Sequence, residues 1–116
     1  KEINLDLAKT ILAPLLGNEG REVSPDHIQK AVADHYGVKI SELRSDRKHK
    51  VVAMPRQVAM FLIREMTRCS FPDIGKQFGG RDHTTVMYAV KKIRKKLTDD
   101  VSLRNTVDIL RKKIEG

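Results

Sequence analysis

The sequence is poor in cysteine, in aromatic residues and in long apolar runs. Its 116 residues include one cysteine and no tryptophan, and aromatic residues make up 4% of the chain. A single cysteine, Cys69, excludes a disulfide framework and a metal site built from several cysteines, and it is typical of a reducing compartment such as the cytoplasm. Because aromatic residues are so few, the core must consist mainly of Leu, Ile, Val, Met and Ala.

No apolar run reaches the roughly 18 residues that a membrane-spanning helix needs. The chain also does not open with the basic, apolar and small-residue pattern of a secretory leader. We therefore expect neither a membrane span nor a signal peptide, and no membrane binding by this domain. The proportions of hydrophobic (40%) and charged (33%) residues are typical of one folded domain.

Positive charge is concentrated in the middle of the chain. The formal net charge is +8, from 23 Lys and Arg against 15 Asp and Glu. Residues 1–46 carry 6 basic and 8 acidic residues, residues 47–98 carry 13 and 3, and residues 99–116 carry 4 and 4. The middle stretch alone therefore has a charge of +10, which indicates a surface that meets a polyanion such as nucleic acid.

Apolar residues recur at intervals of three and four, which predicts an all-α fold. Prolines and capping residues indicate where the helices begin and end. We expect a helix from Ser24-Pro25 to Gly37, a short turn capped by Ser41, a long helix opened by Pro55, a short helix from Ser70 to Phe78, a helix capped by Asp82, and a last helix over residues 101–114.

Two segments fall outside these helices. Residues 45–50 are polar and strongly basic, which predicts an exposed loop. The first twenty residues predict a helix that is apolar on several sides, is bent near Pro14 and is followed by a flexible link. We place a domain boundary near residue 20, so that residues 1–20 belong to a preceding domain and residues 21–116 form the domain proper.

A short helix, a glycine-containing turn and a second helix predict a helix-turn-helix. The turn is Gly79-Gly80-Arg81, and the second helix begins at Asp82. Asp82 can accept from a cytosine amino group, His83 can donate to a base, and the Thr84 methyl can pack on a thymine methyl. Arg81 suits a phosphate, and the basic loop over residues 47–50 offers a second contact with DNA.

Other functions remain open at this point. Asp82 can be a helix cap alone, followed by a merely polar first turn. The basic face can also belong to a helical adaptor that binds an acidic protein. An enzyme is not expected, because no nucleophile and base stand in a recognisable pattern. The four histidines have no metal-ligand spacing, so no metal site is expected.

The motif Phe78-Gly79-Gly80-Arg81-Asp82-His83-Thr84-Thr85-Val86 resembles the signature of the DnaA family of bacterial chromosomal replication initiators, in the C-terminal DNA-binding domain. The resemblance extends from about Val23 to Leu97 and includes Met54-Pro55-Arg56-Gln57 and Ser70-Phe71-Pro72-Asp73-Ile74-Gly75. It implies a helical fold similar to Trp repressor, which binds short asymmetric boxes in double-stranded DNA at the replication origin.

The resemblance also implies roles for single residues. Asp82, His83 and Thr84 match the positions that read bases in the major groove, and Thr85 matches a backbone contact. Lys48 stands where several members insert an arginine into the minor groove, and its neighbour Arg47 is the alternative for that role. The positions that match the family's contacts near phosphates are Arg56, Gln57, Arg64, Ser70, Phe71, Pro72, Lys91 and Lys92. Independently of the resemblance, we expect backbone contacts from Lys50 in the basic loop and from Arg81 in the turn.

The opening segment, residues 1–20, resembles the last helix of the family's ATPase lid and its connector. The chain contains no phosphate-binding loop, so the resemblance places ATP in another part of the protein and implies no cofactor here. Expected partners are origin DNA, other initiator molecules through the other domains, and in some members a regulatory protein. The expected location is the cytoplasm, on the nucleoid.

Overall fold

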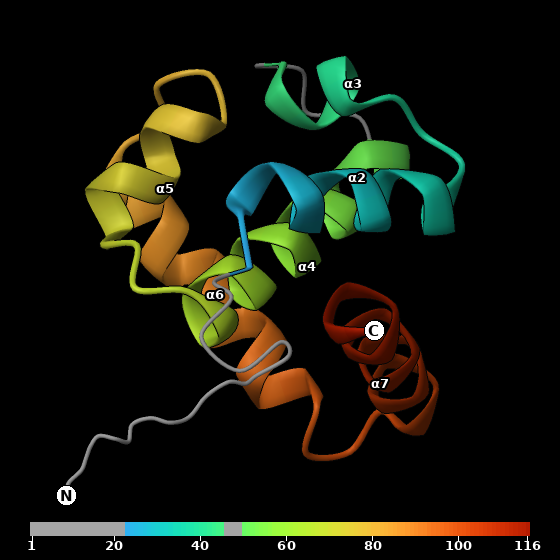
Figure 1. Cartoon of the computed structure of the whole chain (residues 1–116). Coiled ribbons are helices and arrows are strands. Elements are labelled where there is room, and N and C mark those ends of the chain that lie inside the picture. The colour runs from blue at the N-terminus through green and yellow to red at the C-terminus, as the bar shows by residue number, and fades with distance from the viewer. Residues whose placement is uncertain (1–22, 46–49) are drawn as a thin grey trace, which may run out of the picture.

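The computed structural model describes residues 23–45 and 50–116, and both ranges are built from helices (Figure 1). The predicted all-α fold is confirmed, because the described residues contain no strand. The helices are α2 (Pro25–Tyr36), α3 (Ile40–Arg44), α4 (Lys50–Met66), α5 (Phe71–Gln77), α6 (His83–Lys96) and α7 (Val101–Glu115). The predicted boundary near residue 20 lies outside the described residues.

Helix α4 forms the centre of the fold. It packs against α2, α3, α5 and α6, while α7 packs against α2 (Figure 1). The apolar spacing of the sequence predicts a core-facing stripe on this helix, made of Val58, Ala59, Leu62, Ile63 and Met66. The first four are fully buried, and Met66 is partly buried against the same core. The largest fully buried side chains are Phe78, Ile28, Leu43, Met60, Leu62, Ile63, Ile74, Ile93 and Leu110. The core is thus aliphatic, as the scarcity of aromatic residues requires.

Helix α2 has the predicted ends. The Ser24 hydroxyl accepts a hydrogen bond from the His27 amide at 3.0 Å, and Pro25 occupies the first helical position. At the other end Gly37 has a φ of 69°, and its amide donates to the carbonyls of Ala33 and Asp34. Glycine adopts this left-handed conformation without the penalty that a Cβ would impose.

The predicted start of the long helix is wrong. Helix α4 begins at Lys50, so Pro55 lies inside it and the last residue of the predicted loop is helical. Pro55 has no amide hydrogen for the Val51 carbonyl, which weakens this first part of the helix. Burial offsets that loss, because Val52 is 5% exposed and Met54 packs against the core.

The short helix α3 is also capped differently from the prediction. Ser41 lies within the helix, and Lys39 precedes it as the N-cap residue. The Glu42 side chain accepts a hydrogen bond from the Lys39 amide at 2.8 Å. A carboxylate three residues into the helix can thus satisfy the free amide before it, in the manner of a capping box.

The turn between α5 and α6 closes on one carbonyl oxygen. Gly75 accepts hydrogen bonds from the amides of Phe78 at 3.1 Å, Gly80 at 3.1 Å and Arg81 at 2.9 Å. A Cβ on Gly75 would collide with the Arg81 carbonyl, and a Cβ on Gly79 would collide with the Arg44 carbonyl. Gly79 and Gly80 both have a φ of 79°. The turn therefore requires glycine for space at Gly75, for backbone conformation at Gly80, and for both at Gly79.

These glycines give a test of how tightly the turn is packed. We expect Gly75→Ala to destabilise the protein by about 3 kcal/mol or more, because the added methyl meets backbone that cannot move aside. Gly80→Ala meets nothing within 4 Å and should cost about 1 kcal/mol through its left-handed conformation alone. Urea unfolding of both variants measures the difference, and equal losses would contradict the close approach.

Helix α5 begins with a reciprocal cap. The Ser70 hydroxyl accepts from the Asp73 amide, and the Asp73 carboxylate accepts from the Ser70 amide, both at 3.2 Å. Hydrogen bonding with Ser70 lowers the pKa of the Asp73 carboxyl below its ordinary value, and the Ser70 side chain has a larger effect than the Ser70 backbone. The folded state therefore favours the charged carboxylate.

This lowered pKa predicts a dependence of stability on pH. The contribution of Asp73 is fully present above the ordinary pKa of the unfolded chain, and it is lost as the pH falls through the lower folded pKa. We expect Asp73→Asn, which keeps an acceptor oxygen and cannot ionise, to lose less stability than the wild type between about pH 5 and about pH 3. Urea unfolding across that range is the measurement, and Asp108→Asn on α7 is the control. Parallel pH curves for the wild type and Asp73→Asn would refute the linkage.

Candidate nucleic-acid interface

Helix α6 starts with exposed polar side chains. Asp82 is its N-cap, and one carboxylate oxygen accepts from the Thr84 amide at 3.3 Å. The same oxygen lies 3.0 Å from His83 Nδ1. Asp82, His83, Thr84 and Thr85 are all exposed, whereas Val86 directly after them is fully buried. The start of α6 therefore combines a helix cap with four side chains available to a partner.

The helix that Asp82 caps stabilises the ionised form of its carboxyl. The hydrogen bond from the Thr84 amide is the largest cause of a lowered pKa for the Asp82 carboxyl, and His83 adds to the effect. Asp82 is thus an acceptor that stays ionised, as contact with a cytosine amino group requires. The hydrogen bond to the Thr84 amide and the contact with His83 both involve Oδ1 of Asp82. Asp82 can therefore cap the helix with Oδ1 and still offer Oδ2 to a base, although the same geometry would also serve a cap alone.

Arg81 connects the turn to a distant part of the chain. Its Nη2 donates to the Ser45 carbonyl at 2.5 Å, and its buried Nε has no hydrogen-bond partner in the described part of the protein. The side chain is only partly exposed. The structure therefore uses Arg81 to hold the turn against residue 45, and the predicted phosphate contact stays a prediction.

The basic loop is described only at its two ends. Arg47 and Lys48, the candidates for the minor groove, lie outside the described residues, and Lys50 is described as the first residue of α4 without its side chain. The segment begins at Ser45, which the Arg81 hydrogen bond places beside the turn. The start of the loop and the start of α6 are therefore held close together.

Two predicted phosphate contacts of α4 face inwards. Arg56 is 5% exposed, and its Nε and Nη2 donate to the carbonyls of Leu43 at 2.8 Å and Glu42 at 3.0 Å. These carbonyls are at the end of α3, where helical acceptors have no partner within the helix, and the Glu42 carbonyl also accepts from the Ser45 hydroxyl at 2.9 Å. Gln57 is half-buried, with a buried side-chain oxygen that has no partner among the described residues. Arg56 supports the interface from inside, and a direct phosphate contact by either residue stays a prediction.

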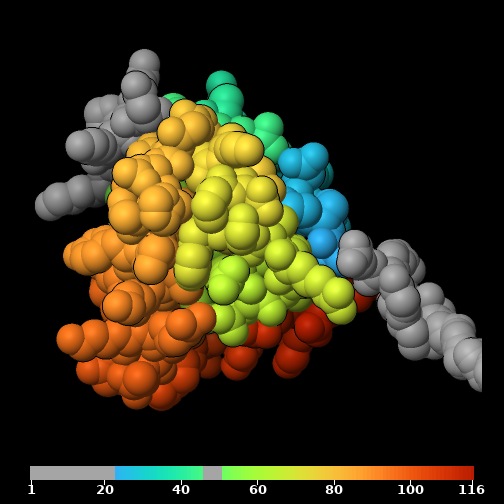
Figure 2. All heavy atoms as spheres, turned by 90° about the vertical axis from the view of Figure 1, so that its left-hand side faces the viewer, coloured from blue at the N-terminus to red at the C-terminus, as the bar shows by residue number. Residues whose placement is uncertain are grey.

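The structure brings four other predicted residues together at the start of α5. The Arg64 guanidinium lies 4.2 Å from the centre of the Phe71 ring and donates to the Cys69 carbonyl at 3.1 Å. Ser70 caps the helix and Pro72 is exposed in its first turn. Figure 2 shows α5 and the first half of α6 side by side on one face of the molecule. Arg64 and the start of α5 can therefore meet the same polyanion as α6.

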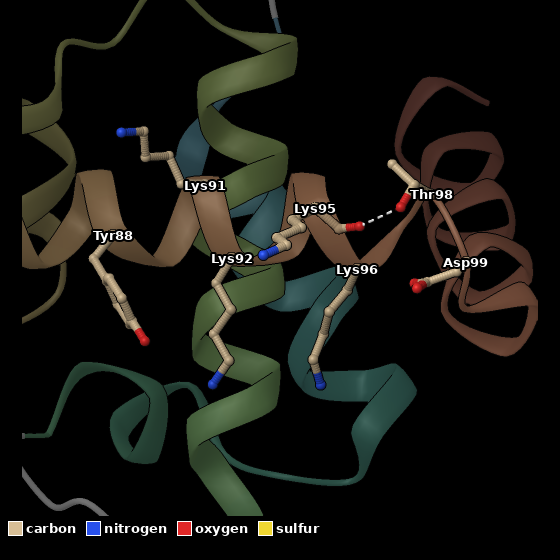
Figure 3. A pocket seen from close by; sticks show the side chains of 7 residues that line it. All are labelled: Tyr88, Lys91, Lys92, Lys95, Lys96, Thr98 and Asp99. Atoms are coloured by element: carbon tan, nitrogen blue, oxygen red, sulfur yellow. Dashed lines mark hydrogen bonds between the residues drawn. The ribbon is translucent and has the colours of Figure 1, made fainter.

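Lys91 and Lys92 lie farther along α6, where they line an open hollow with Tyr88 (Figure 3). Neither lysine forms an ion pair with another described residue, so both ammonium groups are available to phosphates. Sequence reasoning missed Tyr88, which is 67% exposed, and Met87, which is 38% exposed. The sequence could have indicated them, because Met87 and Tyr88 are three and four positions after Thr84, and residues at these spacings share a helix face.

Other kinds of site receive no support from the described residues. They contain no group of three or more His, Cys, Asp or Glu side chains placed to hold a metal ion. None of their helices combines the length and the apolar character that crossing a membrane requires.

Comparison with known proteins identifies the family. A family model described as the helix-turn-helix of the bacterial dnaA protein matches residues 25–93. The chain is 46% identical over 112 residues to the chromosomal replication initiator protein DnaA of Geobacter sulfurreducens, which covers 97% of this chain and 25% of that protein. It is 44% identical over 114 residues to the DnaA of Caulobacter vibrioides, which covers 98% of this chain and 23% of that protein.

A solved structure agrees with these relatives. A crystal structure of a DNA replication initiation factor superposes with a TM-score of 0.67 at 28% identity, covering 78% of this chain and 29% of that one. The chain spans about a quarter of the length of the curated relatives it matches. It belongs to the DnaA family of bacterial chromosomal replication initiators, and it carries that family's DNA-binding helix-turn-helix.

Proposed function

We propose that this chain binds origin boxes in double-stranded DNA with sequence specificity and so recruits its initiator to the origin. One observation carries the proposal: an exposed, polar helix start directly follows a rigid helix-turn-helix turn, within the most basic part of the chain. In helix-turn-helix proteins the N-terminal residues of the second helix contact base edges in the major groove.

The start of α6 would read the bases. The ionised Asp82 carboxylate accepts from a cytosine amino group, His83 donates to a base acceptor, and the Thr84 methyl packs against a thymine methyl. These residues add no net positive charge, so they contribute to the choice of sequence more than to overall attraction. Thr85 would contact the backbone from the same turn.

The basic loop would reach the neighbouring minor groove. Lys48 or Arg47 supplies the inserted side chain, and Lys50 contacts the backbone. A narrow minor groove in A·T-rich DNA has an enhanced negative potential that attracts such cations. The hydrogen bond between Arg81 and Ser45 supports this arrangement, because it holds the start of the loop beside the turn.

The remaining residues would fix the position of the duplex without selecting its sequence. The residues proposed for phosphate contact are Gln57, Arg64, Ser70, Phe71, Pro72, Lys91 and Lys92, with Arg81 and Arg56 acting from partly or largely buried positions. The exposed Arg64 and Pro72 lie at the start of α5, and the exposed Lys91 lies farther along α6. Phosphates on either side of a major groove that holds the start of α6 would meet these two regions.

The wider role follows from the family and rests on parts beyond this chain. Residues 1–20 would end the ATPase lid and connect it to this domain, and ATP would bind in the ATPase domain. Other initiator molecules would assemble through the remaining domains, a regulatory protein would act on some of these surfaces, and the protein would work in the cytoplasm on the nucleoid.

Selection from random DNA tests the central claim without assuming a box sequence. A pool of random duplexes is enriched by repeated binding to the chain, and fluorescence anisotropy then compares the selected duplex with a scrambled one. We expect one short asymmetric sequence to emerge and to bind about 4 kcal/mol or more tightly than the scrambled duplex. An acidic-protein adaptor would enrich no sequence, and equal binding of the two duplexes would refute the proposal.

Alanine substitutions test the base-reading residues separately. His83→Ala and Thr84→Ala should each weaken binding to the selected duplex by roughly 1–3 kcal/mol and reduce the discrimination between duplexes. Asn105→Ala, an exposed position on α7, is the matched control and should leave both quantities unchanged. A uniform loss on the selected and scrambled duplexes would make His83 and Thr84 phosphate contacts instead.

A further inference from the structure

The last turns of α6 form one wall of an open hollow that the proposed duplex contact does not fully use (Figure 3). The hollow measures about 530 Å³ and extends to the turn that leads into α7. It is lined by Tyr88, Lys91, Lys92, Lys95, Lys96, Thr98 and Asp99. In Figure 3, Tyr88, Lys92 and Lys96 project from the same side of α6. The spacing of four residues between them produces this stripe.

The hollow is strongly positive. Its lining contains four ammonium groups and one carboxylate, that of Asp99. No ion pair within the described parts of the chain involves any of the four lysines, so their charge is not neutralised internally. Their methylene stems provide apolar walls below the charged ends, as long lysine side chains commonly do.

Lys95 and Lys96 lie far from the base-reading residues. They are 13 and 14 positions beyond Asp82, which corresponds to about 20 Å along the helix at its ordinary rise. The major groove of B-DNA is only about 8.5 Å deep. A duplex that holds the start of α6 in its major groove therefore has no need of these two lysines for reading bases.

Tyr88 indicates which polyanion the hollow would take. Tyr88 is 67% exposed and lines the hollow beside the lysines. A ring beside lysines is suited to stacking an unpaired base while the ammonium groups meet the adjoining phosphates. The bases of a duplex are stacked within the helix and cannot lie on this ring, so a single strand fits the hollow better.

We infer that this hollow binds a single-stranded segment of nucleic acid, with a base on Tyr88 and phosphates at Lys95 and Lys96, the two lysines that the proposed duplex contact does not use. The binding would be tolerant of sequence, because every base has a face to stack and lysine acts as a point charge. The inference goes beyond the proposed function, and the two are tested by different probes.

A labelled oligothymidylate of about 15 nucleotides is the probe, a length within the range that single-strand sites cover. Its anisotropy is measured with the whole chain while unlabelled selected duplex saturates the base-reading site. The variants are Tyr88→Leu and the double substitution Lys95→Gln/Lys96→Gln. Lys112→Gln/Lys113→Gln removes the same charge from the exposed face of α7 and is the control. Circular dichroism melting checks that all of these variants fold.

We expect the oligothymidylate to bind in the presence of the duplex. Tyr88→Leu should weaken this binding about fivefold or more, as the loss of one stacked base implies. The double variant should reduce the slope of log affinity against log salt by about 1.4, since each phosphate contact of a single strand contributes about 0.7. The control should keep the wild-type affinity for the strand, and all variants should keep their affinity for the duplex.

Four results would overturn the inference. The first is no binding of the oligothymidylate to the wild-type chain, and the second is its displacement by the duplex, which would show one shared surface. The third is an equal loss in the control, which would show diffuse attraction by the net charge. The fourth is an unchanged affinity in Tyr88→Leu, which would remove the stacking contact. Binding of the selected duplex, which tests the proposed function, is measured separately and is independent of these results.

Discussion

The carbonyl oxygen of Gly75 organises the part of the molecule that we propose to meet DNA. Three amides from the following turn donate to it, so the turn cannot change shape without breaking several hydrogen bonds together. The lack of a side chain at Gly75 and Gly79 lets two backbone segments approach more closely than any other residue would allow. The direction of α6, and with it the position of Asp82, His83 and Thr84, depends on this closure.

The features that were predictable from sequence are local. Ser24 followed by Pro25, and Asp82 before a run of apolar residues at helical spacing, identify helix starts because capping involves residues only two or three positions apart. The prediction at Pro55 failed because the first turns of α4 are stabilised by burial, with Val52 at 5% exposure and Met54 packed against the core. Local sequence patterns do not show which residues will be buried by distant parts of the chain, and such burial commonly overrides helix propensity.

The same distinction applies to the interface. The exposed polar start of α6 could be predicted from the motif, whereas the partners of Arg56 and Arg81 could not. Arg81 reaches a carbonyl 36 positions away, and Arg56 reaches carbonyls 13 and 14 positions away. An arginine in a basic region suggests a phosphate contact by its charge alone. Only the folded chain shows which cationic side chains already donate to backbone carbonyls, as Arg56 and Arg81 do, and which remain at the surface, as Lys91 does.

The hydrogen bond from Arg81 to Ser45 has a consequence for how DNA would be recognised. It holds the beginning of the basic loop at a fixed place relative to the start of α6. If the loop and the helix enter neighbouring grooves, the duplex must present those grooves at a matching separation. Base pairs between the two contacts would then influence affinity through their stiffness and twist, although no side chain touches them. The affinity for DNA would then depend on which base steps lie between the two contacts, as a result of this one hydrogen bond within the protein.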